Sequence, residues 1–173
     1  FASCAWGMSS NFNLKIDNKI YFPHSLGIFY QAMTQYLGFK NYGDEYKVMG
    51  LSSYGKPKYF KELSSIINKT KYGFELNLKY FVHHIEKILS IDENRQAVYR
   101  NLYSDKLKNL IGDERSVKEK ISSKHMDIAK SVQAVYEDVF FHILDLLYEK
   151  YKCNKLSLSG GCAMNSVANG KII

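Results

Sequence analysis

The stretch that decides the fold is Lys155-Leu-Ser-Leu-Ser-Gly160-Gly161-Cys-Ala-Met-Asn165, near the end of the sequence. Its leucines alternate with polar residues as in a short strand, two glycines follow, and the pattern from Ala163 onward is helical. Glycines after a strand let a ligand approach the backbone, and the free N–H groups of the next helix face an anion. Taken alone, the pair is explained more simply as a tight turn that needs positive φ.

The segment before this stretch carries the clearest helical pattern in the sequence. One stripe of apolar residues recurs at three- and four-residue spacing and ends near Tyr151: Ile128, Val132, Val135, Val139, Ile143 and Leu146. Ser122 or Ser123 is a candidate N-cap for this helix. We therefore expect a long buried helix that leads into the strand and the glycine turn.

The first 58 residues predict a hairpin, a helix and a loop. Residues 11–21 alternate loosely around Asp17-Asn18, which suggests short strands joined at that dipeptide. An apolar stripe from Leu26 to Leu37 predicts an amphipathic helix that Gly38 ends. Residues 43–57 are punctuated by glycines and predict a cleft loop or a broken helix.

Residues 59–124 are polar and rich in lysine, and we interpret them as a mostly helical insertion. The last segment, 125–173, then holds the long helix followed by strand, glycine pair and helix. Together the segments predict an α/β fold that is helix-rich with a small sheet. Since the sequence starts at Phe1 without Met and stops at Ile173 inside an apparent helix, we expect it to be one domain's fragment of a longer chain.

Composition restricts the classes of function. The formal net charge is +7, but the basic residues are scattered and only three are Arg, so we expect no nucleic-acid partner. Three cysteines without C-x-x-C spacing indicate neither a disulfide framework nor a zinc site, which fits a reducing cytoplasm. No apolar run approaches the roughly 18 residues of a membrane span, so we expect no membrane partner.

Several polar residues stand where they could act on a ligand. His24 precedes a helix and could donate a hydrogen bond or serve as an acid or base, whereas Ser25 is more simply its N-cap. Glu45 and Lys47 stand beside a glycine-bounded loop, which suits a ligand with phosphate and sugar groups or a merely solvated surface. Asn165 could bond a ribose or base, or cap its helix locally.

We predict no metal site among the histidines His83, His84 and His125, because adjacent histidines point in different directions and no carboxylate stands at ligand spacing. Cys162, beside Gly161, is interpreted as a small core residue. A catalytic nucleophile is the alternative for this cysteine, but the sequence names no base to activate it.

Taken together, five ordered segments resemble the NodU/CmcH-type O-carbamoyltransferases. They are Phe22-Pro-His-Ser-Leu-Gly27, Phe29-Tyr-Gln-Ala-Met-Thr-Gln-Tyr-Leu-Gly-Phe39, Asp44-Glu-Tyr-Lys-Val-Met-Gly-Leu-Ser-Ser-Tyr-Gly55, Ala129-Lys-Ser-Val-Gln133 and Leu158-Ser-Gly-Gly-Cys-Ala-Met-Asn165. The resemblance implies a partial domain of the actin, Hsp70 and sugar-kinase (ASKHA) type. The family's usual motif is Gly-Gly-Val-Ala-Leu-Asn, from which Cys162 and Met164 depart while staying apolar.

The resemblance also implies the chemistry. Carbamoyl phosphate and ATP give carbamoyl-adenylate on another domain, and this domain passes the carbamoyl group to a hydroxyl of a small molecule or sugar. Gly160, Gly161 and Asn165 would then face the nucleotide, with Glu45 and Lys47 in the same cleft. By the same resemblance, His24 and Ser25 approach the carbamoyl or acceptor end. A divalent metal, Fe or Mg, would have its ligands outside this sequence.

Two alternatives stay open at this point. One is the branch of the same superfamily that makes threonylcarbamoyl-adenosine or matures hydrogenases, against which the Phe-Pro-His-Ser-Leu-Gly segment argues. The other is a non-catalytic relic that binds a nucleotide or a partner. The acceptor and the oligomeric state cannot be read from these residues.

Overall fold

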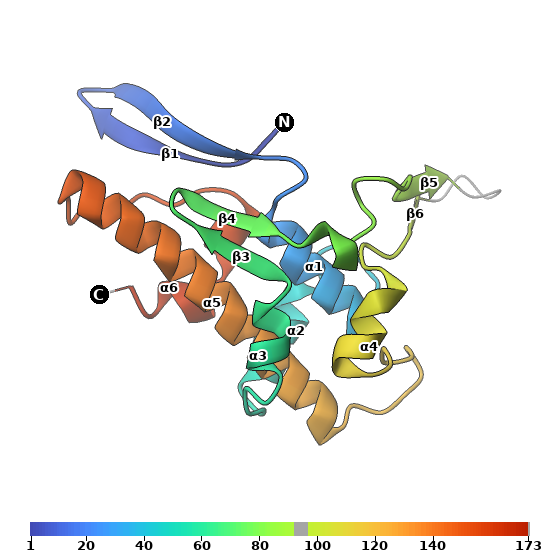
Figure 1. The fold of residues 1–173 in the computed structure, drawn as a ribbon. Coiled ribbons are helices and arrows are strands. Elements are labelled where there is room, and N and C mark those ends of the chain that lie inside the picture. The colour runs from blue at the N-terminus through green and yellow to red at the C-terminus, as the bar shows by residue number, and fades with distance from the viewer. Residues whose placement is uncertain (92–96, 173) are drawn as a thin grey trace.

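The computed structural model describes residues 1–91 and 97–172 and shows a mixed α/β fold arranged around one long helix, α5 (Ser123–Tyr151) (Figure 1). The strands are β1 (Ala2–Ser10), β2 (Asn13–Tyr21), β3 (Ile67–Thr70), β4 (Gly73–Leu76), β5 (Leu89–Ile91) and β6 (Ala97–Tyr99). The shorter helices are α1 (Leu26–Tyr36), α2 (Glu45–Ser52), α3 (Phe60–Ser64), α4 (Lys108–Ile111) and α6 (Ser166–Asn169), with 3-10 turns η1 (Leu78–Tyr80), η2 (Asp105–Leu107) and η3 (Gly161–Met164).

The prediction of a long buried helix before the glycine turn is confirmed by α5. Ser122 is its N-cap, and the Ser122 backbone N–H donates to His125 Nδ1 at 3.0 Å. The predicted apolar stripe is buried from Ile128 to Ile143 and packs against α1, α2, α3 and β4. The apolar face of α5 is therefore the surface against which these other elements pack.

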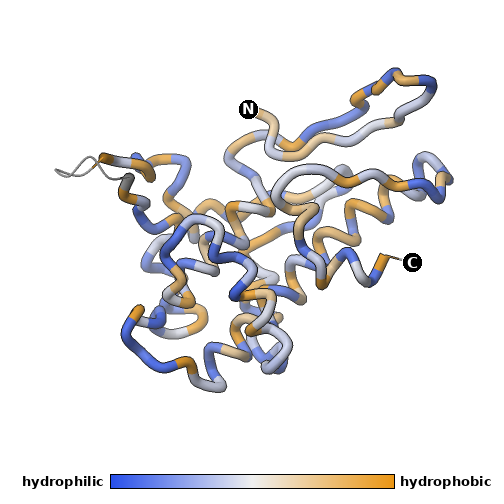
Figure 2. The backbone as a smooth tube through the Cα atoms, turned by 180° about the vertical axis from the view of Figure 1, so that it is seen from behind, coloured by the Kyte–Doolittle hydropathy of each residue, from blue (hydrophilic) through white to orange (hydrophobic). Residues whose placement is uncertain are grey.

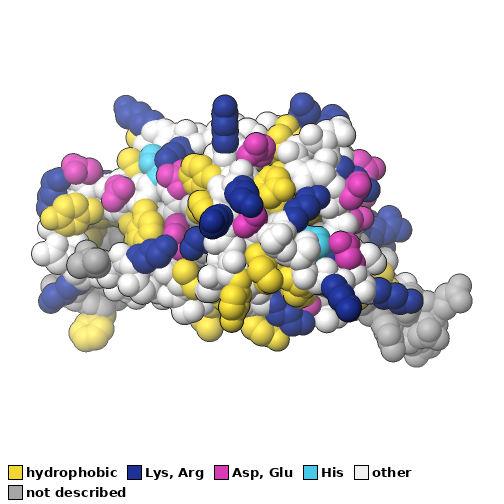
Figure 3. All heavy atoms as spheres, turned by 90° about the horizontal axis from the view of Figure 1, so that it is seen from below, with side chains coloured by type: hydrophobic (Ala, Val, Ile, Leu, Met, Phe, Trp, Pro, Cys, Tyr) yellow, Lys and Arg dark blue, Asp and Glu magenta, His cyan; other side chains and the backbone are white. Residues whose placement is uncertain are grey.

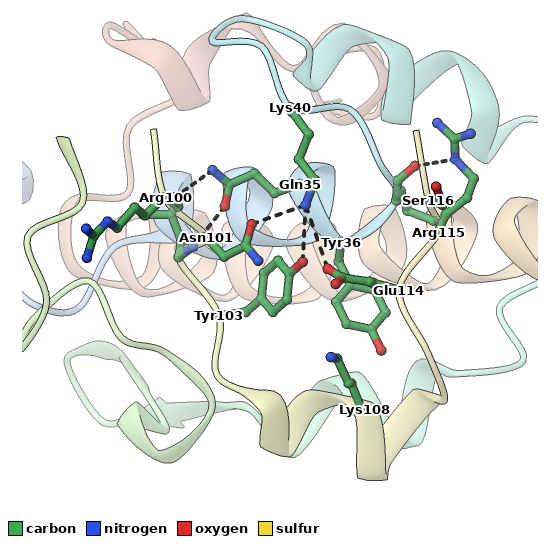
Figure 4. Close-up of polar contacts among 12 residues, drawn as sticks. Gln35, Tyr36, Lys40, Arg100, Asn101, Tyr103, Lys108, Glu114, Arg115 and Ser116 are labelled. Atoms are coloured by element: carbon green, nitrogen blue, oxygen red, sulfur yellow. Dashed lines mark hydrogen bonds and ion pairs between the residues drawn. The ribbon is translucent and has the colours of Figure 1, made fainter. Parts of the chain in front are cut away.

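The predicted amphipathic helix is α1, and both of its predicted ends are confirmed. Ser25 Oγ accepts the Ile28 N–H at 3.3 Å, as an N-cap should, and Gly38 follows the helix with a φ of +79°. Arg115 stabilises the C-terminal end of α1, because its Nε donates to the Leu37 carbonyl at 2.6 Å (Figure 4).

The N-terminal hairpin is present, but the predicted turn at Asp17-Asn18 is wrong. β1 and β2 join at Asn11 and Phe12, whose φ values of +49° and +66° are those of a tight hairpin turn. Asp17 instead lies in a β-bulge of β2, where Lys150 Nζ approaches its carboxylate at 2.9 Å. The hairpin extends to one side of the molecule, as the tube in Figure 2 shows, and Lys150 near the end of α5 contacts it.

The predicted strand at Lys155–Ser159 is not formed in the described structure. Leu156 and Leu158 are 47% and 36% exposed, and no neighbouring strand pairs with them among the described residues. Alternating leucines define a strand only where another strand accepts its hydrogen bonds. The helix expected from Ala163 onward is also shorter than predicted, since it divides into η3 and α6.

Residues 59–124 are not mostly helical. Short helices alternate there with two antiparallel pairs, β3–β4 and β5–β6, while residues 92–96 lie outside the described part. Apolar side chains on these short elements are buried against the α-helices, including Leu63, Ile66 and Phe74. The segment completes the core, so tertiary packing overrides its weak helical propensity.

Candidate functional site

The glycine turn presents bare backbone. Gly160 has a φ of +94°, so the positive φ that the sequence suggested belongs to this residue. Among the described residues, a Cβ atom added at Gly160 or at Gly161 would find no atom within 4 Å apart from its own chain neighbours. Both glycines therefore face open space, and a ligand could lie directly against the chain there.

The turn is fastened to α1 and α5. Tyr136, on α5, donates its hydroxyl hydrogen to the Cys162 carbonyl at 2.7 Å. The Cys162 Sγ atom lies 3.7 Å from the position that a Cβ on Gly27 would take, in the first turn of α1. These contacts bring the start of α1, with His24 and Ser25 just before it, beside the glycine turn.

His24 is held by the first small sheet of the middle segment. The Leu76 backbone N–H donates to His24 Nδ1 at 3.0 Å. Since Nδ1 accepts, the neutral imidazole carries its proton on Nε2 and offers a donor there. Ser25 Oγ is occupied as the cap of α1. The catalytic roles expected of these two residues stay predictions.

Asn165 is buried and forms a reciprocal amide pair with Gln133 of α5. Asn165 Nδ2 donates to Gln133 Oε1 at 3.1 Å, and Gln133 Nε2 donates to Asn165 Oδ1 at 3.0 Å. Asn165 Oδ1 also accepts the Ala168 N–H at 3.0 Å, so it caps α6. The side chain is thus used within the protein, and contact with a nucleotide stays a prediction. In this structure Asn165 anchors the glycine turn to α5.

A phenol and a carboxylate adjoin this amide pair. Tyr30 donates its hydroxyl hydrogen to Gln133 Oε1 at 2.8 Å, and Glu137 accepts from Gln133 Nε2 at 3.0 Å. Burial raises the Tyr30 pKa above its ordinary value, and the charges of Glu137 and Glu45 raise it further. Glu45, on α2, is thus near enough for its charge to act on Tyr30, and its place in a shared cleft stays a prediction.

Lys47 points elsewhere. Its Nζ pairs with Asp44 Oδ1 at 2.7 Å and lies 5.7 Å from the centre of the Phe39 ring. The hydrogen bond to Asp44 raises the Lys47 pKa, so the ammonium stays charged at neutral pH. The structure gives Lys47 no contact with the Gln133 cluster among the described residues, and its role toward a ligand stays a prediction.

Cys162 is mostly buried, as expected of a core residue. Burial raises its pKa to about 11, so the thiol is neutral at physiological pH and is a poor nucleophile. Among residues 1–91 and 97–172, no three side chains of His, Cys, Asp or Glu gather as metal ligands. These residues do not fit the expected divalent metal, and we assign it none of them.

Sequence reasoning missed the centre of this cluster. Gln133 is 1% exposed and Tyr30 is 5% exposed, although both carry groups that need hydrogen-bond partners. The signal that could have found Gln133 is a polar residue beside the apolar stripe of a long helix, where a buried partner is required. Nothing in the spacing indicated Asn165, 32 residues away, as that partner.

The outer surface is mixed in character. On the face shown in Figure 3, Lys and Arg side chains are interspersed with acidic and hydrophobic ones. Within the part of the chain that the structure describes, none of the helices has both the length and the apolar composition needed to cross a bilayer.

Comparison with known proteins gives the family. Residues 4–173 match the family described as "Carbamoyltransferase N-terminus". The chain is 37% identical to an uncharacterised protein of Synechocystis sp. over 158 residues, which cover 90% of this chain and 24% of that protein. It is 31% identical to nodulation protein NolO of Bradyrhizobium diazoefficiens over 160 residues, which cover 91% of this chain and 25% of NolO.

A third relative, nodulation protein NolNO of Sinorhizobium fredii, is 31% identical over 157 residues, which cover 88% of this chain and 19% of NolNO. The chain thus spans about a quarter or less of the length of these relatives. The family match extends over both the start of α1 and the glycine turn, the two regions that the fold brings together. The chain belongs to the carbamoyltransferase family, and it corresponds to part of that family's N-terminal region.

Proposed function

We propose that this chain forms the acyl-transfer part of an ATP-dependent O-carbamoyltransferase with the actin-like nucleotide-binding fold. Carbamoyl-adenylate, made elsewhere in the full-length protein from carbamoyl phosphate and ATP, would bind at the glycine turn. The acceptor hydroxyl oxygen then bonds to the carbamoyl carbon, the bond from that carbon to the phosphate oxygen breaks, and AMP leaves with the electron pair. The proton of the hydroxyl passes to a base.

The observation that carries the proposal is the open backbone at Gly160 and Gly161. Among the described residues, a Cβ on either glycine would meet no atom beyond its chain neighbours within 4 Å, while Cys162 and Asn165, which follow the glycines, tie the turn to α5. A turn whose glycine N–H groups donate to no carbonyl of the described chain suits an anionic phosphate, because these donors are free to bind it.

A second task is proposed for His24. With its proton on Nε2, it can donate a hydrogen bond to the carbamoyl oxygen, on which negative charge develops during attack. Of the roles that the sequence left open to His24, this hydrogen-bond pattern favours the donor. Glu45 and Glu137 add negative charge near Tyr30 and suit the hydroxyl groups of a ribose better than its phosphate.

The experiment uses the full-length protein with carbamoyl phosphate, ATP, a divalent metal and a panel of alcohols. Carbamate ester formation above a heat-killed control supports the proposal. Nucleotide binding without any transfer would favour the non-catalytic relic, and transfer of a threonylcarbamoyl group to adenosine in tRNA would favour the neighbouring branch. The 173-residue chain by itself should give no turnover, since it spans about a quarter of its relatives.

A further inference from the structure

A cavity lies on the face of α1 that carries Ile28, Gln31 and Gln35. It has a volume of about 250 Å³ and is bounded by α1, by the segment before it and by the middle segment of the chain. Ile28, Gln31 and Gln35 line it from one stripe of the helix, whereas Tyr30 points to the Gln133 cluster. Because Gly27 adjoins Cys162, the first turn of α1 separates this cavity from the glycine turn.

The wall opposite α1 is fixed by hydrogen bonds. Gln35 Nε2 donates to the Arg100 carbonyl at 3.2 Å, and the Leu102 N–H donates to Gln35 Oε1 at 2.8 Å (Figure 4). Lys40 Nζ donates to Asn101 Oδ1 at 3.1 Å and to the Tyr103 hydroxyl at 3.3 Å. The cavity is therefore preformed, and a ligand would not have to order its walls.

Three exposed aromatic rings line the cavity. Phe22 is 51% exposed, Tyr42 is 78% exposed and Tyr99 is 43% exposed. Tyr42 and Tyr99 stack with their ring centres 6.0 Å apart and 21° between their planes. This stacking uses part of the Tyr42 and Tyr99 rings, and the remaining exposed apolar surface of the three rings is available to a ligand.

Polar groups stand among these rings. His83 is 8% exposed, and its Nε2 donates to the Pro23 carbonyl at 2.8 Å. Its Nδ1 is buried and has no hydrogen-bond partner among the described residues, which is costly unless a donor arrives. Burial lowers the His83 pKa, so the ring stays neutral and Nδ1 stays an acceptor. Gln31 adds an amide that can donate and accept.

The charge of the lining restricts the ligand. Among the described residues that line the cavity, none is Asp, Glu, Lys or Arg. A phosphate would find no counter-charge here, which argues against carbamoyl phosphate or a nucleotide. A flat hydrocarbon would cover the rings but leave Gln31 and His83 without partners. A neutral ring that carries hydroxyl groups can cover the aromatic rings and also bond to Gln31 and His83. The volume of the cavity suits a single ring of this kind.

We propose that this cavity binds one neutral sugar ring of the hydroxyl-bearing acceptor, packed on Tyr42 and Phe22 and hydrogen-bonded by Gln31 and His83. The assignment to the acceptor rests on the proposed carbamoyl transfer, whereas the binding of a neutral sugar ring does not. The cavity lies beside the first turn of α1, and His24 stands two residues before this helix begins.

The test is a ligand-detected NMR titration of the full-length protein with three neutral methyl hexosides as probes. At least one hexoside should bind, and Tyr42→Ala should weaken its binding about tenfold, the order expected for a lost aromatic face. Tyr72→Ala is the matched control, because Tyr72 is 63% exposed but lies in the turn between β3 and β4, outside the cavity lining. This control should bind the hexoside as the wild type does.

A second variant, Gln31→Leu, keeps the size of the side chain and should also weaken hexoside binding. The proposal is overturned if no hexoside binds, if Tyr42→Ala and Tyr72→Ala behave alike, or if p-cresol alone binds at the cavity. ATP binding measured on the same samples should be unchanged by Tyr42→Ala. If the full-length protein carbamoylates no alcohol, the proposed function fails, while the titration still decides whether the cavity holds a sugar.

Discussion

Replacement of Gln133 by leucine tests the cluster that fixes the glycine turn. In the wild type, Gln133 Oε1 accepts from Tyr30 and from Asn165 Nδ2, and the side chain is 1% exposed. Gln133→Leu leaves these two buried donors without a partner, at about 1–3 kcal/mol each. Burial of the apolar leucine side chain offsets about 1–2 kcal/mol of this loss. We therefore expect the free energy of unfolding to fall by roughly 3 kcal/mol.

The assay is urea unfolding of the chain followed by circular dichroism, with Tyr30→Phe as the milder comparison. Tyr30→Phe removes one hydrogen-bond donor but leaves Asn165 paired with Gln133. It should therefore lower the free energy of unfolding by about 1 kcal/mol. Combining Gln133→Leu with Asn165→Leu should cost less than the sum of the single changes, since both remove the same pair. A loss below about 0.5 kcal/mol for Gln133→Leu, or strict additivity in the double variant, would refute the reasoning.

Three further predictions concern other buried groups. Arg115→Ala should lower the free energy of unfolding by about 2–3 kcal/mol, measured from urea midpoints, because the Leu37 carbonyl loses its donor. Cys162, with a pKa raised to about 11, should react with iodoacetamide at pH 8 far more slowly than exposed Cys153, as mass spectrometry of the alkylated peptides would show. The Asp127 pKa lies below its ordinary 3.8, because Lys58 and the Lys56 N–H donate hydrogen bonds to the carboxylate. The ionised carboxylate therefore stabilises the fold at neutral pH, and this stabilisation fades as the pH falls below 3.8. Wild type and Asp127→Asn should differ in urea midpoint at pH 7 and converge at low pH.

The spacing of apolar residues in the sequence predicted the two helices that each bury one apolar stripe. α5 and α1 were foreseen with their caps, because an apolar stripe, a capping serine and a terminal glycine are all local signals. The hairpin turn was misplaced because Asp17-Asn18 has turn-like composition, yet a bulge accommodates it and Lys150 binds its carboxylate. The prediction for the middle segment was wrong for the opposite reason, since β4 depends on burial against α5 rather than on its own pattern.

The candidate site was predictable only in its parts. The glycine pair and the His24 position follow from the sequence around them, and the fold brings both to the first turn of α1. The amide pair of Gln133 and Asn165 could not be foreseen, since it joins residues 32 apart through the packing of α5 and α6. The aromatic cavity likewise depends on long-range contacts, such as the stacking of Tyr42 on Tyr99.

The central claim is that the glycine turn faces the adenylate, and Gly161→Val in the full-length protein tests it most directly. A Cβ at Gly161 meets no atom of the described chain within 4 Å, and its φ is not in the left-handed region, so the variant should fold as judged by circular dichroism. By the proposed function, the added side chain would occupy the space that the adenylate takes. We predict that pyrophosphate release from ATP in the presence of carbamoyl phosphate continues while carbamoyl transfer to the acceptor is lost. Transfer that remained intact in this variant would contradict the account.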